Sequence, residues 1–169
     1  MDYVFDNIGN ELSIEYLENK CKEHNLKCEP KTISKMIDKL ISHFLEPFCH
    51  NPTFLINHPA IMSPLAKTFE NNKNISQRFE LFINGNEYAN AYSELNDPRI
   101  QKINFENQLK DKNNGDEEAQ IPDLDFITAL EYALPPCGGL GIGLVRLIML
   151  LSNCSTIKEV VTFPTIKII

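Results

Sequence analysis

The sequence predicts a single domain of the α+β class, spanning residues 1–169, with a mostly antiparallel sheet flanked by helices. A length of 169 residues suits one domain with one sizeable core. Asn84-Gly85 lies between two runs rich in aromatic and branched residues. This is typical of a hairpin, because both positions of a two-residue turn need positive φ. Apolar residues at three-four spacing over residues 33–45 predict an amphipathic helix.

The N-terminal part of the chain predicts a short edge strand at Val4 and Phe5, followed by a helix over residues 10–24. The residues expected to face inward from this helix are Leu17, Cys21 and Tyr16. The second helix, over residues 33–45, has Thr32 as its cap and ends at Pro47. Residues 53–56 then predict a short strand.

After the hairpin the sequence predicts two more helices. Asp97-Pro98 offers a cap and a first-turn proline for a helix that ends near residues 113–115. Its inward stripe is expected at Ile100, Ile103 and Leu109. Residues 110–118 are polar and predict a loop, and residues 123–132 predict a short amphipathic helix. We expect the helices over 33–45 and 144–151 to pack on one side of the sheet.

Composition narrows the class of protein. The chain carries 16 basic and 23 acidic residues, for a net charge of −7, which argues against a chain whose main role is to grip a phosphate backbone. No apolar run approaches the roughly 20 residues that a membrane helix requires. The N-terminus is neither basic nor apolar, so we expect a cytoplasmic protein without membrane contact.

The predicted hairpin carries two acids that we expect on one face. With a two-residue loop, Phe82 faces Glu87 and Glu80 faces Ala89. Side chains two apart share a face, so Glu80 and Glu87 project from the same side. Neighbouring carboxylates repel unless a cation or a proton lies between them, so the spacing indicates a divalent metal or a shared proton. The alternative is an ordinary half-solvated hairpin with charged outer residues.

Two further polar residues of the second strand are expected on the other face of the sheet from Glu87, because side chains alternate between faces along a strand. Asn90 and Glu94 share a parity with each other but not with Glu87. If both serve one site with Glu80 and Glu87, a bulge or bend is expected between Glu87 and Asn90. Such bulges are common beside active sites.

A glycine-rich segment precedes the last apolar helix, with Arg146 just after it. Its glycines are Gly138, Gly139, Gly141 and Gly143. Glycine at alternate strand positions lets a flat ligand approach the backbone, and Arg146 supplies a permanent cation for a phosphate. Neither the P-loop nor the dinucleotide-binding pattern is present, so a glycine-kinked core strand is the alternative. Combined with the acidic hairpin, the segment describes a nucleotide site with Mg²⁺ on the phosphates.

At these residues the chain resembles the C-terminal part of the catalytic domain of class II lysyl-tRNA synthetases, of the subclass that also includes the aspartyl and asparaginyl enzymes. The resemblance covers nearly the whole chain, in seven blocks that follow in the right order. These are residues 51–54, 58–67, 78–83, 90–98, 115–119, 129–132 and 138–146, the last corresponding to motif 3.

The resemblance implies roles for individual residues. In that family, acids at the positions of Glu80 and Glu87 bind ATP through magnesium, in agreement with the shared face. The position of Glu94 meets the ε-ammonium of lysine, and a buried carboxylate selects a cationic side chain. Arg146 resembles the motif 3 arginine that acts on ATP as the catalytic residue. The full implied sets are Glu80, Glu87, Gly141, Gly143 and Arg146 for ATP, Asn90, Tyr92, Glu94 and Gly138 for lysine, and Glu80 and Glu87 for the metal.

The implied reaction is the activation of lysine with ATP to lysyl-adenylate and its transfer to tRNA(Lys) by a homodimeric full enzyme. No side-chain nucleophile is required, because positioning and charge neutralisation carry the rate.

The sequence also departs from the family pattern. Val145 stands where the family usually has aspartate before the motif 3 arginine, and residues 163–168 diverge from the usual ending. Nothing matches the anticodon-binding barrel, motif 1 or motif 2. We therefore expect an incomplete site, an exposed sheet edge with apolar surface, and no aminoacylation by the isolated chain.

Two main hypotheses follow. The chain is either part of a lysyl-tRNA synthetase or a truncated, non-catalytic relative that serves as a regulatory or interaction module. A third is an α+β domain whose acids and glycines are purely structural. The first is favoured, because a module without substrate has little physical reason to keep unpaired acids.

Overall fold

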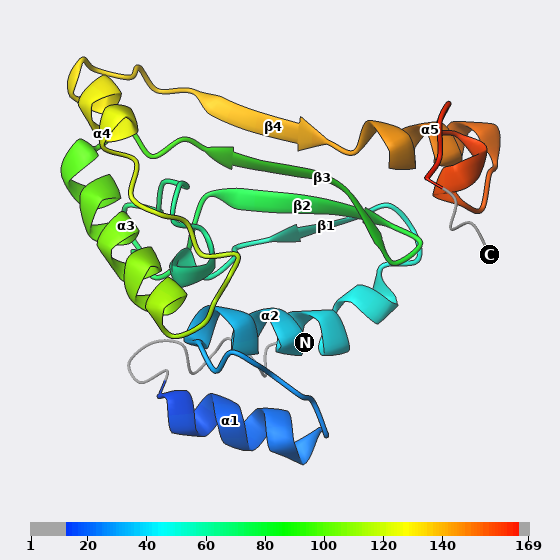
Figure 1. Cartoon of the computed structure of the whole chain (residues 1–169), viewed down its shortest axis with the longest axis horizontal. Helices are drawn as coiled ribbons and strands as arrows, with labels where there is room; N and C mark the ends of the chain where they lie inside the picture. The colour runs from blue at the N-terminus through cyan, green and yellow to red at the C-terminus, as the bar shows by residue number, and fades with distance from the viewer. Residues whose placement is uncertain (1–12, 166–169) are drawn as a thin grey trace.

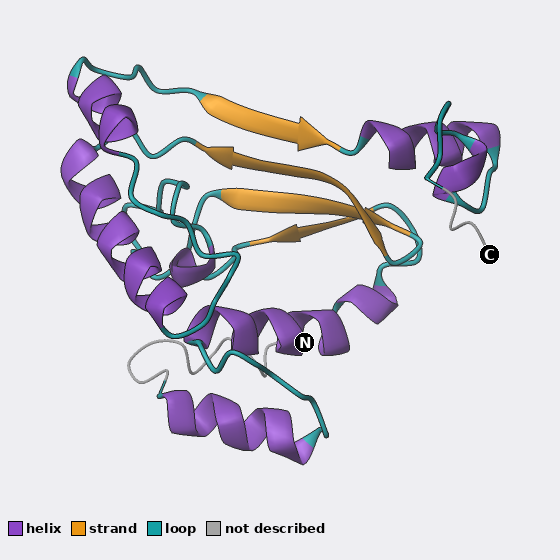
Figure 2. Ribbon diagram, in the orientation of Figure 1, coloured by secondary structure: helices purple, strands orange, loops and turns teal. Residues whose placement is uncertain are grey.

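The computed structural model describes residues 13–165 as a four-stranded antiparallel sheet with helices at one end and beside one edge (Figure 1, Figure 2). The strands, in spatial order, are β1 (Thr53–Ile56), β2 (Arg78–Ile83), β3 (Asn86–Ser93) and β4 (Gly138–Ile142). The α-helices are α1 (Ile14–Glu23), α2 (Ile33–Phe44), α3 (Pro98–Asn113), α4 (Leu124–Glu131) and α5 (Leu144–Ser152). The predicted α+β class is confirmed. The strand predicted at Val4 and Phe5 lies outside the described residues.

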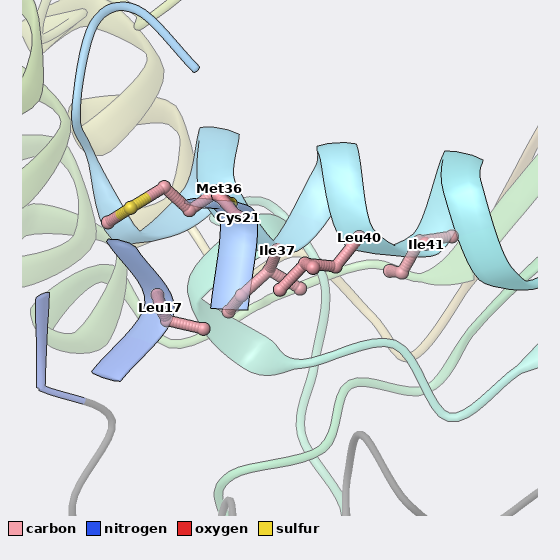
Figure 3. Packing of buried hydrophobic residues seen from close by; sticks show 6 residues of the cluster. All are labelled: Leu17, Cys21, Met36, Ile37, Leu40 and Ile41. Carbon is pink, nitrogen blue, oxygen red and sulfur yellow. The ribbon is translucent and has the colours of Figure 1, made fainter. Parts of the chain in front are cut away.

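The main apolar core packs α1 against α2 beside the sheet (Figure 3). Its buried members are Leu17, Cys21, Met36, Ile37, Leu40 and Ile41. Thr32 caps α2 as predicted, its hydroxyl accepting a hydrogen bond from the Lys35 amide at 3.4 Å. The prediction that Tyr16 faces inward is wrong, because successive helix residues are about 100° apart and Tyr16 lies beside the buried stripe. Leu55 of β1 also packs on this core and joins α2 to the sheet.

The hairpin of β2 and β3 contains the predicted turn and the predicted bulge. Asn84 and Gly85 have φ of 51° and 70°, as a two-residue turn requires. The strand pairs are Ile83↔Asn86, Phe82↔Glu87, Leu81↔Ala89 and Glu80↔Asn90. Tyr88 is therefore an extra residue, which places the bulge between Glu87 and Asn90. The predicted pairing of Glu80 with Ala89 is wrong, because the inserted residue moves every later pair by one.

Helices α3 and α4 lie side by side at the end of the sheet where β3 ends and β4 begins (Figure 1). The predicted inward stripe of α3 is wrong: Ile100, Ile103 and Leu109 are exposed, whereas Gln101 and Phe105 are buried. The Gln101 amide donates to the Pro64 carbonyl at 3.1 Å, and Phe105 packs edge-on to Phe126 of α4. These contacts decide which face turns inward. The loop predicted from residue 110 begins only after Asn113, where α3 ends.

Helix α5 does not pack on the sheet, so the prediction for residues 144–151 is wrong, whereas α2 does contact the sheet through Leu55. It continues from β4 beyond the end of the sheet, and none of its residues is buried (Figure 1). Its exposed apolar residues include Leu144, Ile148 and Leu151. One face of the sheet is open as well, with Phe54, Ile56, Leu140 and Ile142 exposed. Within the described chain, β1 and β4 are both edge strands, which confirms the expected exposed edge and apolar surface.

The cap of α2 gives a stability prediction. Thr32→Ala removes the acceptor for the Lys35 amide and is expected to lower the free energy of unfolding by about 1 kcal/mol. Thr32→Ser keeps the hydroxyl and should retain most of the stability that the cap contributes. Urea unfolding of the three proteins measures the difference, and equal stability of all three would contradict the capping role.

Candidate active site

A polar cluster occupies the sheet face that carries Arg78 and Glu80 of β2. The Glu80 carboxylate accepts hydrogen bonds from Arg78 Nη2 at 2.5 Å and from Asn90 Nδ2 at 3.2 Å. Arg78 Nε in turn donates to Asn90 Oδ1 at 3.1 Å. The bulge makes this contact possible, because it places Asn90 directly opposite Glu80. Tyr92, opposite Arg78, continues the same face.

Arg78 also ties the cluster to the segment that follows β1. Its Nη1 donates to the Met62 carbonyl and to Ser63 Oγ, both at 3.1 Å. The side chains of Arg78 and Glu80 are 16% and 14% exposed, so their ion pair is largely shielded from water. Arg78 thus fixes the position of Glu80 while it compensates the charge.

The second acid, Glu87, lies near Glu80 across the bulge. Burial raises the pKa of Glu80, the guanidinium of Arg78 opposes this rise, and the negative charge of Glu87 adds to it. The two carboxylates therefore interact on one side of the sheet. A cation between them would relieve this repulsion.

The donor set fits Mg²⁺. This ion takes hard oxygen ligands and is often held by one or two carboxylates together with substrate phosphates. Within residues 13–165, no group of three or more His, Cys, Asp and Glu side chains converges on one point as a complete cage. Glu80 and Glu87 are two carboxylates of this face that could hold such an ion together with water and phosphate.

His58 borders the cluster from the segment after β1. Its Nε2 lies 3.7 Å from Glu80 Oε2 and donates to the Leu55 carbonyl at 3.2 Å. Burial, and then the charge of Arg78, lowers the pKa of His58 to about 4. The imidazole is therefore neutral at pH 7, and its approach to Glu80 is a polar contact rather than an ion pair.

Glu94 follows β3 at the end of the same face. Within the described chain its carboxylate has no hydrogen-bonding or ion-pairing side chain, and burial raises its pKa. Burial also raises the pKa of Tyr92, with a further contribution from the charge of Glu94, so the two side chains are neighbours. A cavity of about 510 Å³ reaches Glu94; its lining also includes Lys67, Gln77, Ser93 and Cys137.

The glycines of β4 border the same face. Gly141 pairs with Asn90 and Gly139 with Tyr92, so both stand beside the polar cluster without a side chain. Gly138 pairs with Ser93 and has the opposite parity. The Gly143 amide donates to the Tyr88 carbonyl at 2.9 Å, which links the end of β4 to the bulge.

Arg146, in the first turn of α5, is exposed and donates to the Glu87 carbonyl. The structure thus brings the bulge, Gly143 and Arg146 together at one end of the polar face. Glu94 and Gly138 lie toward the other end, where β4 begins.

Sequence reasoning missed three residues of this site. Arg78 had a usable signal, because it stands two residues before Glu80 and shares its face. His58 had none, because its contact depends on how the segment after β1 folds back. Gly139 belongs to the glycine-rich segment expected to border the ligands, but the sequence indicated no separate role for it. Its place beside Glu94 follows from the register of β4, which the sequence does not fix.

The role of Arg78 gives a second prediction. Arg78→Gln should lower the free energy of unfolding by roughly 3 kcal/mol, because a shielded carboxylate loses its charged partner. Arg78→Lys keeps the charge but not the planar fork, and should lose an intermediate amount. Arg99→Gln is the matched control, since Arg99 is exposed, and should change stability little. In urea unfolding, a loss for Arg78→Gln no larger than that of the control would contradict the bridging role.

The sequence of this chain is similar to those of known proteins. The family model for class II tRNA synthetases (D, K and N) matches residues 8–167. A protein of Vairimorpha ceranae named probable cytoplasmic lysine–tRNA ligase is 47% identical over 95% of this chain and 32% of its own length. Its namesake in Encephalitozoon cuniculi is 48% identical over 99% of this chain and 33% of its own. The lysine–tRNA ligase of Thermotoga maritima is 49% identical over 90% and 30%.

The chain therefore spans about a third of the length of the curated relatives it matches. None of the helices described in the structure is long and apolar enough to cross a membrane. The match to the family model covers nearly the entire sequence, and the chain belongs to the class II tRNA synthetases of the D, K and N group.

Proposed function

We propose that residues 1–169 form the C-terminal portion of the catalytic domain of a lysyl-tRNA synthetase, in which they hold ATP and lysine. The observation that carries the proposal is the sheet face that Glu80, Asn90 and Tyr92 share, with Glu94 at its end. Membership of the family and the names of the relatives support the reaction type.

Lysine is selected by Glu94. A carboxylate that is partly desolvated and has no partner within the described chain attracts a cationic side chain, because the ammonium relieves the cost of burying the negative charge. Asn90 and Tyr92 flank the path from Glu94 toward Glu80 and contact the rest of the amino acid. The backbone at Gly138 borders it from β4.

ATP lies nearer the bulge. Glu80 and Glu87 hold Mg²⁺, whose charge neutralises the phosphates when it is bound. Arg146 leaves the Glu87 carbonyl for a phosphate, because an exposed guanidinium gains more from a charged acceptor than from a neutral one. Gly141 and Gly143 have no side chains, so a flat base can approach the backbone of β4.

The chemistry is acyl activation followed by acyl transfer. An oxygen of the lysine carboxylate attacks the α-phosphorus of ATP, the new P–O bond forms, and the bond to pyrophosphate breaks. Transfer of lysine to the terminal ribose of tRNA(Lys) then releases AMP. The residues of this chain orient the reactants and balance their charge. The complete protein is a homodimer and is cytoplasmic, a location supported by relatives that are named cytoplasmic lysine–tRNA ligases.

A truncated relative that acts as a regulatory or interaction module is the second candidate. Val145, beside Arg146, and the exposed apolar face of α5 favour it. The mass of the endogenous polypeptide, captured with an antibody against residues 104–119, separates the two. A species about three times as large supports the synthetase, and one of 19.3 kDa supports the module.

Glu94→Gln in the complete protein tests lysine selection. It removes the charge paired with the ammonium and should raise the KM for lysine at least tenfold, with the KM for ATP changed about twofold or less. Lysine-dependent pyrophosphate exchange measures both. Glu106→Gln is the matched control, because Glu106 is exposed on α3. Equal losses for both substrates would sink the assignment of Glu94.

Glu87→Gln tests the metal ligands with two readouts. In this chain alone it should lower the pKa of Glu80, because the charge of Glu87 is one of the causes of its elevation. NMR titration of labelled glutamate measures that change. In the complete protein it should weaken the apparent affinity for Mg²⁺ about tenfold in the exchange assay. An unchanged Mg²⁺ requirement would remove Glu87 from the metal site.

A further inference from the structure

We infer that Gly139 is a positioning residue that sets where the Glu94 carboxylate lies, and with it the choice of a lysine side chain. The inference rests on the proposed function, since it gives Glu94 the role of receiving the ε-ammonium. Gly139 would act by leaving space, not by contacting the substrate.

The space is defined by one distance. A Cβ placed on Gly139 would lie 2.1 Å from Glu94 Oε1 and 3.3 Å from its carboxyl carbon. Apart from the chain neighbours of Gly139, nothing else in the described residues would come within 4 Å of that Cβ. The carboxylate thus occupies the place where any other residue would carry its side chain. The φ of Gly139 lies outside the left-handed range, so the requirement is for space alone.

Other glycines of β4 lack this relation to a side chain. A Cβ on Gly138 would meet only the Tyr92 carbonyl, at 3.6 Å, and one on Gly141 only the Asn90 carbonyl, at 3.7 Å. Both are ordinary contact distances. Gly139 is therefore the one glycine of this strand at which a methyl group would displace a site residue.

The local register holds Glu94 over this gap. The Glu94 amide donates to the Cys137 carbonyl at 3.0 Å, two residues before Gly139, and Gly139 pairs with Tyr92. The backbone is thus fixed both at Glu94 and at Gly139. The carboxylate has no partner within residues 13–165 to hold its rotamer. The missing side chain at Gly139 is what leaves room for the carboxylate in the position that it occupies.

This arrangement predicts a selective defect. The atom that a methyl at position 139 would strike is the far end of a flexible side chain, which can rotate away without moving the backbone. Gly139→Ala should therefore keep the fold and lose the aligned carboxylate. An aligned, partly desolvated carboxylate is what distinguishes lysine from a neutral amino acid of similar length.

The experiment uses the complete protein in lysine-dependent pyrophosphate exchange. Gly139→Ala should raise the KM for lysine about tenfold or more, with the KM for ATP changed about twofold or less and the midpoint of thermal unfolding unchanged. Gly138→Ala should affect lysine use less. Leu140→Ile is the control, since Leu140 is exposed on the opposite face of β4. Loss of cooperative unfolding in Gly139→Ala would overturn the inference. It would mean that the added methyl group disturbs the fold and not only the Glu94 carboxylate.

A double-mutant cycle with Glu94→Gln decides whether Gly139 acts through Glu94. In the Glu94→Gln background, Gly139→Ala should add little to the KM for lysine. An equal increase in the KM for lysine on Gly139→Ala in the wild-type and Glu94→Gln proteins would overturn the inference. If Glu94→Gln is defective and Gly139→Ala is normal, this inference fails while the proposed function stands. If Glu94→Gln itself leaves lysine use unchanged, both fail.

Discussion

The inserted residue at Tyr88 is the constraint on which the site depends. In an unbroken hairpin, side chains alternate between faces, and Asn90 would point away from Glu87. One extra residue in β3 reverses that parity and places Asn90 opposite Glu80. At the bulge, the Glu87 carbonyl accepts from Arg146, and the Tyr88 carbonyl accepts from the Gly143 amide in continuation of the β3–β4 pairing. A single bulge thus aligns the polar side chains and anchors the segment that leads into α5.

Charge on this face is only partly balanced by the chain itself. Arg78 compensates Glu80 and is itself held by hydrogen bonds to Asn90, Met62 and Ser63. Glu87 adds repulsion, however, and Glu94 stays without a partner among the described residues. Buried or half-buried acids in this state destabilise the free protein and favour cationic ligands. A magnesium ion at one end of the face and an ammonium at the other would supply the missing charges. The opposite face of the sheet is apolar and open.

Local signals in the sequence predicted local structure well. Asn84-Gly85 specified the turn, Thr32 the cap of α2, and the conflict of parity between Glu87 and Asn90 required the bulge that the structure contains. The inward face of α3 could not be predicted, because it depends on tertiary contacts: Gln101 donates to the Pro64 carbonyl and Phe105 packs against Phe126 of α4, while Ile100 and Ile103 stay exposed. The position of α5 could not be predicted either, because its apolar residues are typical of a helix packed on a sheet, yet none of them is buried. The role of His58 depends on how the segment after β1 folds back, and that of Gly139 depends on the register of β4. No short motif encodes either of these.

We propose that Glu94, in the space left by Gly139, receives the amine of lysine on the face that holds ATP. A crystal structure of the complete protein with a non-hydrolysable lysyl-adenylate analogue tests this most directly. We expect the ε-ammonium about 3 Å from the Glu94 carboxylate, with the adenylate extending toward Asn90 and Glu80. An amine held by another acid, with the Glu94 side chain turned away from Gly139, would contradict it.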